Sequence, residues 1–172
     1  KDRLYLYDHF GSMETENLMS KIRVMIHNCG VDFIVLDHIS IVISGMEGGD
    51  ERRAIDNLMT MLRSVVEETN VGMLLISHLR RASGDKGHED GAQITLSQLR
   101  GSGAIAQLSD GVVGLERDAQ STTSGDNIGI RILKNRFGGM LGRADTLNYD
   151  HKTGRISHIE EEEEFDDVDS DF

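Results

Sequence analysis

Two polar residues, Asp37 and His78, each follow a short apolar run, at residues 33–36 and 73–76. The unbroken run at residues 33–36 predicts a strand that is buried on both faces, as in the centre of a parallel sheet, and residues 71–76 predict a second apolar strand. An acid where a central strand ends can hold Mg²⁺ on a nucleoside triphosphate, mostly through water, because Mg²⁺ loses its hydration shell reluctantly. An Asp in this place can equally cap the next turn, so residues 33–40 alone leave both interpretations open.

A helix predicted over residues 51–69 joins these two strands. Its apolar residues recur at helical spacing and form one stripe, which comprises Ile55, Leu58, Met59, Leu62, Val65 and Val66. A strand–helix–strand unit brings the carboxyl ends of its parallel strands to the same edge of the sheet, which would place Asp37 beside His78. A His beside a metal-binding acid can sense a phosphate, although a lone His at a strand end is more often a hydrogen-bonded structural residue.

The remaining elements complete an α/β fold. A strand is expected over residues 4–8, and a helix over residues 14–27 that Gly30 ends. Shorter strands are expected over residues 111–116, 128–134, 144–150 and 155–159, the last two joined by a hairpin turn. Because no long helix separates these later strands, we expect a mostly parallel sheet flanked by helices with an antiparallel C-terminal extension.

The composition indicates one globular domain followed by an acidic tail. The chain has 172 residues, and no apolar run approaches the roughly 20 residues that a membrane span needs. The net charge is −12, but it is only −3 for residues 1–159, where 21 acids face 18 bases. This near-neutral body does not exclude a nucleic-acid partner. A single cysteine and the lack of a signal peptide at the start lead us to expect a cytoplasmic protein that does not bind membranes.

The tail, residues 160–172, contains nine acids and no Lys or Arg. Such a run buries too little apolar surface to fold, so we expect it to be disordered when unbound. It carries two aromatic residues, Phe165 and Phe172, among acids that include Asp169 and Asp171. An acidic segment with aromatic anchors suits docking on a basic partner surface with pockets, and the alternative is a solubilising tail.

Two polar segments could contact an anion. The segment from residue 79 to 91 contains Arg80, Arg81, Lys86 and His88. A flexible basic loop can follow a nucleic-acid backbone, but the three acids of this segment are also typical of a solvated surface loop. The run Arg100-Gly101-Ser102-Gly103 can present backbone N–H groups to an anion, and it can equally be the turn between two short helices.

Several of these motifs together resemble a known family. The chain is similar to the C-terminal part of the helicase domain in the primase-helicases of short-tailed phages, a branch of the DnaB-like hexameric replicative helicases with a RecA-type fold. The resemblance covers essentially the whole chain. It rests on Leu36-Asp37-His38-Ile39-Ser40, Asp56-Asn57-Leu58-Met59-Thr60, His78-Leu79, Leu99-Arg100-Gly101-Ser102-Gly103-Ala104, Gln107-Leu108-Ser109-Asp110, Leu115-Glu116-Arg117, Arg131-Ile132-Leu133-Lys134 and Arg136-Phe137.

The resemblance implies roles for individual residues. Asp37 would be the Walker B acid that holds Mg²⁺, and His78 would sense the γ-phosphate. Arg136, with Lys134 beside it, would be an arginine finger supplied to the nucleotide of the neighbouring subunit. The nucleotide-binding positions would be Arg117 and Tyr149, which flank the adenine, and Gln107. The DNA-facing residues would be Arg80, Arg81, Lys86, His88, Arg100, Gly101, Ser102 and Gly103, with Gly84 standing where the family carries another Lys.

The resemblance also implies the function of the intact protein. We expect a replicative DNA helicase whose hexameric ring hydrolyses ATP or dTTP with Mg²⁺, moves on single-stranded DNA and unwinds the duplex at a phage replication fork, in the cytoplasm of the infected bacterial host. Residues 160–172, through Phe165, Asp169, Asp171 and Phe172, would dock the replicative DNA polymerase.

One motif of the family is missing. The sequence contains no G-x-x-x-x-G-K-[ST] loop, the element that cradles the phosphates. In the family this loop precedes the point where the chain begins, so we expect residues 1–159 to be the C-terminal part of a RecA-like helicase domain that is inactive alone. The alternatives are a RecA-like recombinase of the same fold and a non-enzymatic fragment that docks a polymerase.

Overall fold

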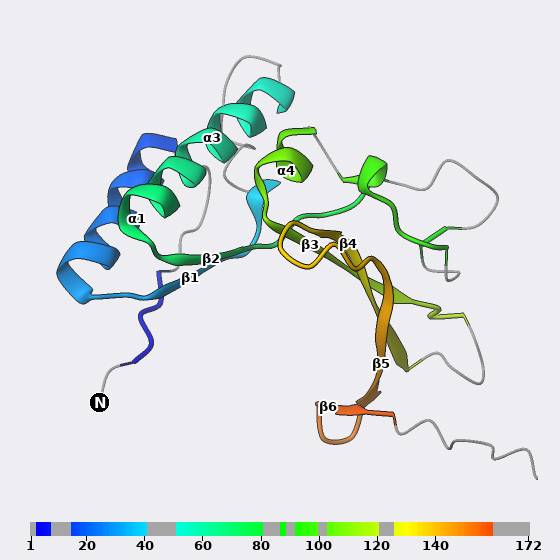
Figure 1. Cartoon of the computed structure of the whole chain (residues 1–172). Coiled ribbons are helices and arrows are strands. Elements are labelled where there is room, and N and C mark those ends of the chain that lie inside the picture. Colours follow the sequence, from blue (N-terminus) through cyan, green and yellow to red (C-terminus); the bar gives the residue numbers. More distant parts are fainter. Residues whose placement is uncertain are drawn as a thin grey trace, which may run out of the picture.

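Two separate sheets, one parallel and one antiparallel, carry the fold (Figure 1). The computed structural model describes residues 3–7, 15–40, 51–80, 87–88, 92–99, 103–120 and 126–159. The elements in chain order are α1 (Thr15–Cys29), β1 (Phe33–Leu36), α3 (Glu51–Thr69), β2 (Gly72–Leu75), the 3₁₀ helix η1 (Leu96–Gln98), α4 (Gly103–Leu108), β3 (Gly111–Arg117), β4 (Asn127–Asn135), β5 (Gly142–Asp150) and β6 (Arg155–His158).

The parallel sheet consists of β1 and β2, joined through α3. The register runs from Phe33 opposite Gly72 to Leu36 opposite Leu75. Helix α3 forms because its apolar residues lie on one stripe, and six of them are buried: Ala54, Ile55, Leu58, Met59, Leu62 and Val65. It ends before Asn70, which adopts a φ of 56° that Asn tolerates better than most residues. The predicted strand–helix–strand unit is therefore confirmed.

Helices α1 and α3 cover one face of the parallel sheet (Figure 1). Ile34 of β1 packs in the core with residues of both helices, among them Ile22 and Leu58. On the other face Phe33 and Val35 are 57% and 56% exposed. The prediction that this strand is buried on both faces is thus wrong for the described residues. Successive side chains of a strand point to opposite faces, and helices α1 and α3 cover only one of them.

The antiparallel sheet has the strand order β3-β4-β5-β6. Strands β5 and β6 are joined by a turn in which the Asp150 carboxylate accepts hydrogen bonds from the Lys152 backbone N–H at 2.8 Å and the Thr153 hydroxyl at 2.6 Å. The predicted late strands and the hairpin are confirmed. The antiparallel strands form their own ladder, and helix α4 packs against α3.

Residues 3–7 have no regular secondary structure, and their side chains are exposed. The strand predicted over residues 4–8 is therefore wrong for its described part, residues 4–7. The alternation of apolar and aromatic residues satisfied the strand pattern, but a strand also needs a neighbour for its backbone groups, and no ladder in the described part of the chain includes these residues. No described helix is both long and apolar enough to cross a membrane.

Candidate functional site

Asp37 and His78 lie at the same edge of the parallel sheet, as predicted. They follow adjacent strands whose last paired residues are Leu36 and Leu75. Two further backbone hydrogen bonds extend the pairing: Ile76 N–H donates to Leu36 O at 3.0 Å, and Ile39 N–H donates to Ile76 O at 3.0 Å. The backbone therefore fixes the relative positions of the two strand ends.

A second histidine, His38, lies between these strand ends. Its ring is 4.3 Å from the His78 ring, centroid to centroid, in an edge-to-face arrangement. Its Nδ1 atom is buried and has no hydrogen-bond partner among the described residues. His38 and His78 come two and three residues after Leu36 and Leu75, the last paired residues of the two strands.

The Asp37 side chain is exposed, and no described residue forms a hydrogen bond to its carboxylate. A carboxylate that keeps its lone pairs available suits Mg²⁺, which prefers one or two protein oxygens and completes its shell with water and phosphate. No group of three or more His, Cys, Asp or Glu side chains in the described ranges could hold a metal by itself. The Asp37 carboxylate therefore fits a magnesium ion that arrives with a nucleotide.

The two predicted DNA-facing segments start from adjacent backbone. Leu79 forms an isolated antiparallel bridge with Leu99, and Arg80 N–H donates to Gln98 O at 2.8 Å. Nε2 of His88 donates to Arg80 O at 2.9 Å, which joins the two sides of the first segment. The backbone positions at which the two segments begin are thus hydrogen-bonded to each other. Arg81, Lys86, Arg100, Gly101 and Ser102 lie outside the described residues, and Gly103 is the first residue of α4.

Arg136 follows the end of β4, and Asp110 holds it. Nη1 of Arg136 donates to Asp110 Oδ1 at 3.0 Å, and Arg136 N–H donates to Asp110 O at 2.9 Å. The other carboxylate oxygen of Asp110 accepts a hydrogen bond from Nη1 of Arg63, on α3, at 2.8 Å. Hydrogen bonds from Arg63 and then Arg136 hold the pKa of the Asp110 carboxyl below its ordinary value, and burial opposes them only in part.

Lys134 is bound to the C-terminal end of α4. Its Nζ donates to Ala106 O at 2.6 Å and to Gln107 O at 3.1 Å. A cation there satisfies carbonyls that have no partner within the helix and interacts favourably with the helix dipole. Lys134 therefore fixes α4 to β4, while the Gln107 side chain remains exposed.

Arg117 and Tyr149, the two residues predicted to flank an adenine, meet at Asp126. Arg117 Nη2 lies 3.5 Å from Asp126 Oδ1, and Tyr149 N–H donates to Asp126 O at 2.9 Å. The Tyr149 ring is 5.0 Å from the ring of His151, which in turn contacts Asp126. The structure thus brings these two predicted residues together, next to the start of β4.

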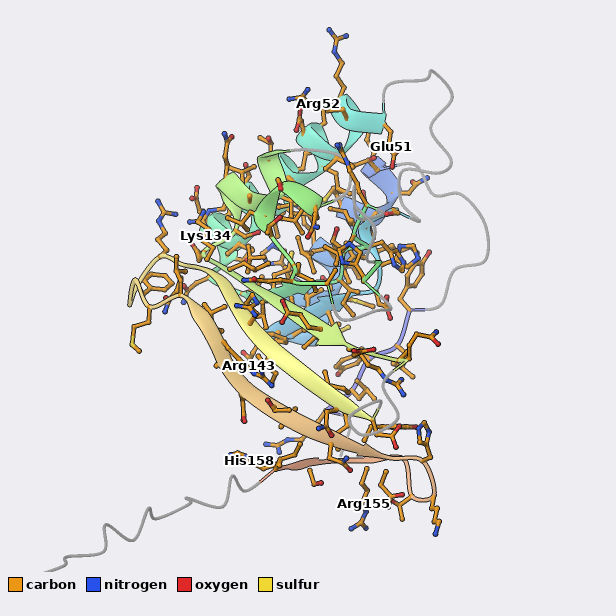
Figure 2. All side chains as sticks on the ribbon, turned by 90° about the vertical axis from the view of Figure 1, so that its right-hand side faces the viewer. Glu51, Arg52, Lys134, Arg143, Arg155 and His158 are labelled. Carbon is orange, nitrogen blue, oxygen red and sulfur yellow. The ribbon has the colours of Figure 1, made fainter. Side chains whose placement is uncertain are left out.

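Arg136 lies at the opposite end of β4 from this cluster. Strand β4 has nine residues, so its two end residues are separated by about 26 Å at a rise of roughly 3.3 Å per residue. In Figure 2, Lys134 near the end of β4 lies close to the helices, and Arg155 of β6 lies at the far end of the antiparallel sheet. Arg136 and the Arg117–Tyr149 pair of one chain therefore lie at opposite ends of β4.

Sequence reasoning missed an ion pair inside the antiparallel sheet. Nε of Arg131 donates to Glu116 Oε1 at 2.6 Å, and the side chains of Arg131 and Glu116 are only 18% and 16% exposed. Glu116 Oε1 also accepts a hydrogen bond from Ile94 N–H at 2.8 Å. Burial raises the pKa of the Glu116 carboxyl, but the hydrogen bonds from Arg131 and Ile94 outweigh burial, so the pKa falls below its ordinary value.

A signal for this pair was present in the alternation of the strands. Gly129 is opposite Glu116 in the antiparallel register. Arg131, two residues after Gly129, is therefore a diagonal neighbour of Glu116 on the same face of the sheet. The contact with Ile94 could not be read in this way, because it joins the sheet to an irregular segment.

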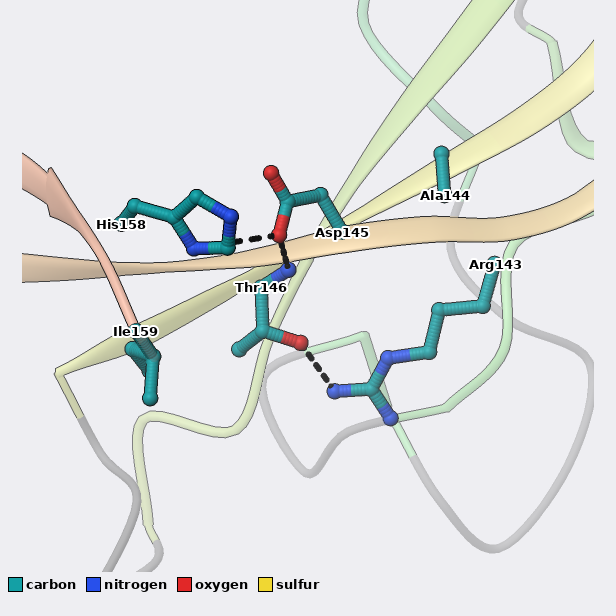
Figure 3. A pocket seen from close by; sticks show the side chains of 6 residues that line it. All are labelled: Arg143, Ala144, Asp145, Thr146, His158 and Ile159. Atoms are coloured by element: carbon teal, nitrogen blue, oxygen red, sulfur yellow. Dashed lines mark hydrogen bonds and ion pairs between the residues drawn. The ribbon is translucent and has the colours of Figure 1, made fainter. Parts of the chain in front are cut away.

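The antiparallel sheet also carries a cavity of about 450 Å³ between β5 and β6 (Figure 3). It is lined by Arg143, Ala144, Asp145, Thr146, His158 and Ile159. Its polar side chains contact one another, since Arg143 donates to the Thr146 hydroxyl and His158 lies 3.7 Å from Asp145. None of the predicted site residues lines this cavity.

The chain is similar to known replicative helicases. A sequence model of the DnaB-like helicase C-terminal domain matches residues 1–158. The DNA helicase/primase of Enterobacteria phage T3 is 42% identical over 153 residues, which are 89% of this chain and 27% of that protein. The chain thus spans about a quarter of that relative's length.

Two solved structures have the same fold. One is a DnaB-like replicative helicase, described with its interactions with primase: it has a TM-score of 0.69 and 20% identity, and the match covers 87% of this chain and 36% of that one. The other is an ATPase domain with a TM-score of 0.68, 20% identity, and coverage of 87% and 52%. These likenesses confirm the RecA-like fold class. The chain therefore belongs to the family of DnaB-like helicase C-terminal domains.

Proposed function

We propose that this chain is part of a replicative DNA helicase that uses nucleoside triphosphate hydrolysis to move along single-stranded DNA and to unwind duplex DNA at a phage replication fork. One observation carries the proposal: Asp37 and His78 leave adjacent parallel strands at one edge, and the DNA-facing segment begins directly after His78. Ligands of open α/β sheets bind at this edge. Family membership and the phage relative support the same activity.

The site residues divide the work of hydrolysis between two subunits. Asp37 would hold Mg²⁺ on ATP or dTTP, and His78 would contact the γ-phosphate. When bound, Mg²⁺ neutralises charge on the β- and γ-phosphates. Arg117 and Tyr149 would flank the base, with Gln107 near the nucleotide. Arg136, with Lys134 fixing its strand to α4, would reach the nucleotide of the next subunit, which agrees with its distance along β4 from Arg117.

Movement on DNA would follow from the direct backbone connection between His78 and the DNA-facing segment that comes after it. Loss of the γ-phosphate would release His78, and the segment after it would shift. Because Leu79 forms a β-bridge with Leu99, the first residues of both DNA-facing segments would shift together. The residues proposed to contact the DNA backbone are Arg80, Arg81, Lys86, His88, Arg100, Gly101, Ser102 and Gly103.

The proposal includes the assembly in which these residues act. An arginine finger supplied between subunits requires a closed ring, which we propose to be a hexamer. The phosphate-cradling loop would come from elsewhere in a longer polypeptide, because the 172 residues contain no such motif. Residues 160–172, through Phe165, Asp169, Asp171 and Phe172, would dock the replicative polymerase. This work would take place in the cytoplasm of the infected host.

Unwinding of a forked DNA substrate by the full-length protein tests the proposal. We expect Asp37→Asn to abolish triphosphate-dependent unwinding and to leave binding of single-stranded DNA intact. Asp32→Asn is the matched control, because Asp32 precedes the same strand at its opposite end and its side chain is exposed. Full unwinding by the Asp37→Asn protein would contradict the role of Asp37. Strand exchange between homologous duplexes without unwinding would instead favour a recombinase.

A further inference from the structure

We propose that Asp110 is a positioning residue for Arg136, and that Arg63 holds Asp110 in turn. This inference rests on the proposed role of Arg136 as an arginine finger. It adds a requirement within the same subunit, because the resemblance assigns no role to Asp110 or Arg63.

Asp110 attaches Arg136 at two points. The Asp110 backbone carbonyl accepts Arg136 N–H at 2.9 Å, and its carboxylate accepts Nη1 of the same residue at 3.0 Å. The first contact fixes the backbone where β4 ends, and the second restricts the direction of the side chain. A long side chain held in this way loses less freedom when it meets its target.

Arg63 fixes the carboxylate from the other side. Its Nη1 donates to Asp110 Oδ2 at 2.8 Å, so the two guanidinium groups use different oxygens of one carboxylate. Arg63 belongs to α3, whose buried stripe packs in the core, and its Nε donates to Glu67 at 2.8 Å. The direction of Arg136 is therefore linked through Asp110 and Arg63 to α3, six of whose residues are buried.

The ion pair with Asp110 leaves part of the Arg136 guanidinium accessible to a phosphate. Only Nη1 is used, and within the described ranges Nε and Nη2 of Arg136 have no hydrogen-bond partner. The side chain is 57% exposed. The Nε and Nη2 donors can form a bidentate contact with phosphate oxygens. Asp110 thus orients the guanidinium without covering the side that would meet a phosphoryl group.

Single-turnover hydrolysis by the full-length ring, at a protein concentration that keeps slow rates measurable, tests this inference. We expect Asp110→Asn to lower the rate constant at saturating nucleotide by about 10- to 100-fold with little change in KM, because a misplaced catalytic group loses rate and not ground-state binding. Arg63→Gln should cause a smaller loss of the same kind and carries the test if Asp110→Asn rings do not assemble. Glu68→Gln is the control, because this exposed carboxylate lies on the same helix but pairs with Arg23 and not with Arg63, and the variant should stay within about twofold of wild type.

The decisive comparison is made in an Arg136→Ala background. If Asp110 acts through Arg136, Asp110→Asn has no further effect there. An equal loss in both backgrounds, or a faster rate in Asp110→Asn alone, overturns the inference. If Arg136→Ala by itself leaves hydrolysis unchanged, the proposed finger role fails instead, and the two failures are thereby distinguished.

Discussion

The end of strand β1 and the antiparallel sheet β3–β6 present their polar residues in opposite ways. Asp37, at the end of β1, has an exposed carboxylate to which no described residue forms a hydrogen bond. In the antiparallel sheet and the turn after β4, four cationic side chains are engaged: Arg117 with Asp126, Arg131 with Glu116, Arg136 with Asp110, and Lys134 with carbonyls of α4.

The difference corresponds to two requirements, one for a residue that binds a ligand and one for a cation that reaches a neighbouring subunit. A residue that must bind a metal or a phosphate needs its lone pairs or protons available, and the end of a parallel strand provides that without further contacts. A cation that must reach a neighbouring subunit from a surface turn needs a partner that fixes its direction. Under the proposed function, the end of the parallel strand offers a ligand-binding group, while contacts in the antiparallel sheet orient a group that acts on the neighbouring subunit.

The largest effect is expected at Arg136. Arg136→Ala in the full-length ring should lower nucleotide hydrolysis by about 10³- to 10⁵-fold, because an arginine finger stabilises charge that develops on the phosphoryl group. Steady-state hydrolysis at saturating nucleotide measures this loss. Arg155→Ala, on exposed strand β6, is the matched control and should retain wild-type rates. A normal rate in Arg136→Ala would show that the ordered cations of this sheet serve only its stability.

A smaller effect is expected at Glu116. Glu116→Gln removes the charged acceptor of Arg131 and Ile94, so the local stability of the sheet should fall by about 1.5–3 kcal/mol. Hydrogen exchange of the peptide that contains Ile94 measures this fall. Asp126→Asn is the contrast: its pair with Arg117 is exposed, and we expect at most about 1 kcal/mol. Equal changes in the two variants would mean that burial does not distinguish these ion pairs.

The smallest effect is a dependence on pH. The Glu116 pKa is lowered in the folded chain, so its ion pair stabilises the fold above the ordinary Glu value of about 4.5, and this contribution is lost as pH falls through the lower folded value. Between pH 7 and pH 4, wild type should therefore lose more protection at Ile94 than Glu116→Gln does. A difference between the two proteins that stays constant over this range would contradict the assignment.

Much of the parallel unit could be predicted from the sequence because its signals are local. The apolar stripe of α3 gave the bounds 51–69, which the structure matches, and the apolar runs before Asp37 and His78 located both strand ends. Burial on both faces could not be predicted, because burial depends on what packs against the strand and not on the strand itself. The strand predicted over residues 4–8 was wrong in its described part for a related reason, because a strand also depends on a neighbour that pairs with its backbone.

The contacts that orient Arg136 could not be predicted from spacing. Arg63 and Asp110 are 47 residues apart, and Asp110 and Arg136 are 26 apart, so no helical or strand periodicity connects them. The resemblance to a family marked Arg136 and the Asp110 motif separately. Only the packing of α3 against α4, and the return of β4 beside β3, brought the three residues together.

The central claim is that the Asp37 of one subunit and the Arg136 of the next complete a single site. Mixing full-length Asp37→Asn with full-length Arg136→Ala, each inactive alone, tests it through basal hydrolysis in the absence of DNA. Random mixing in equal amounts creates complete sites at roughly a quarter of the interfaces, so we predict recovery to about a quarter of the wild-type rate. No recovery in rings that are shown to be mixed would place both residues at a site within one subunit and contradict the account.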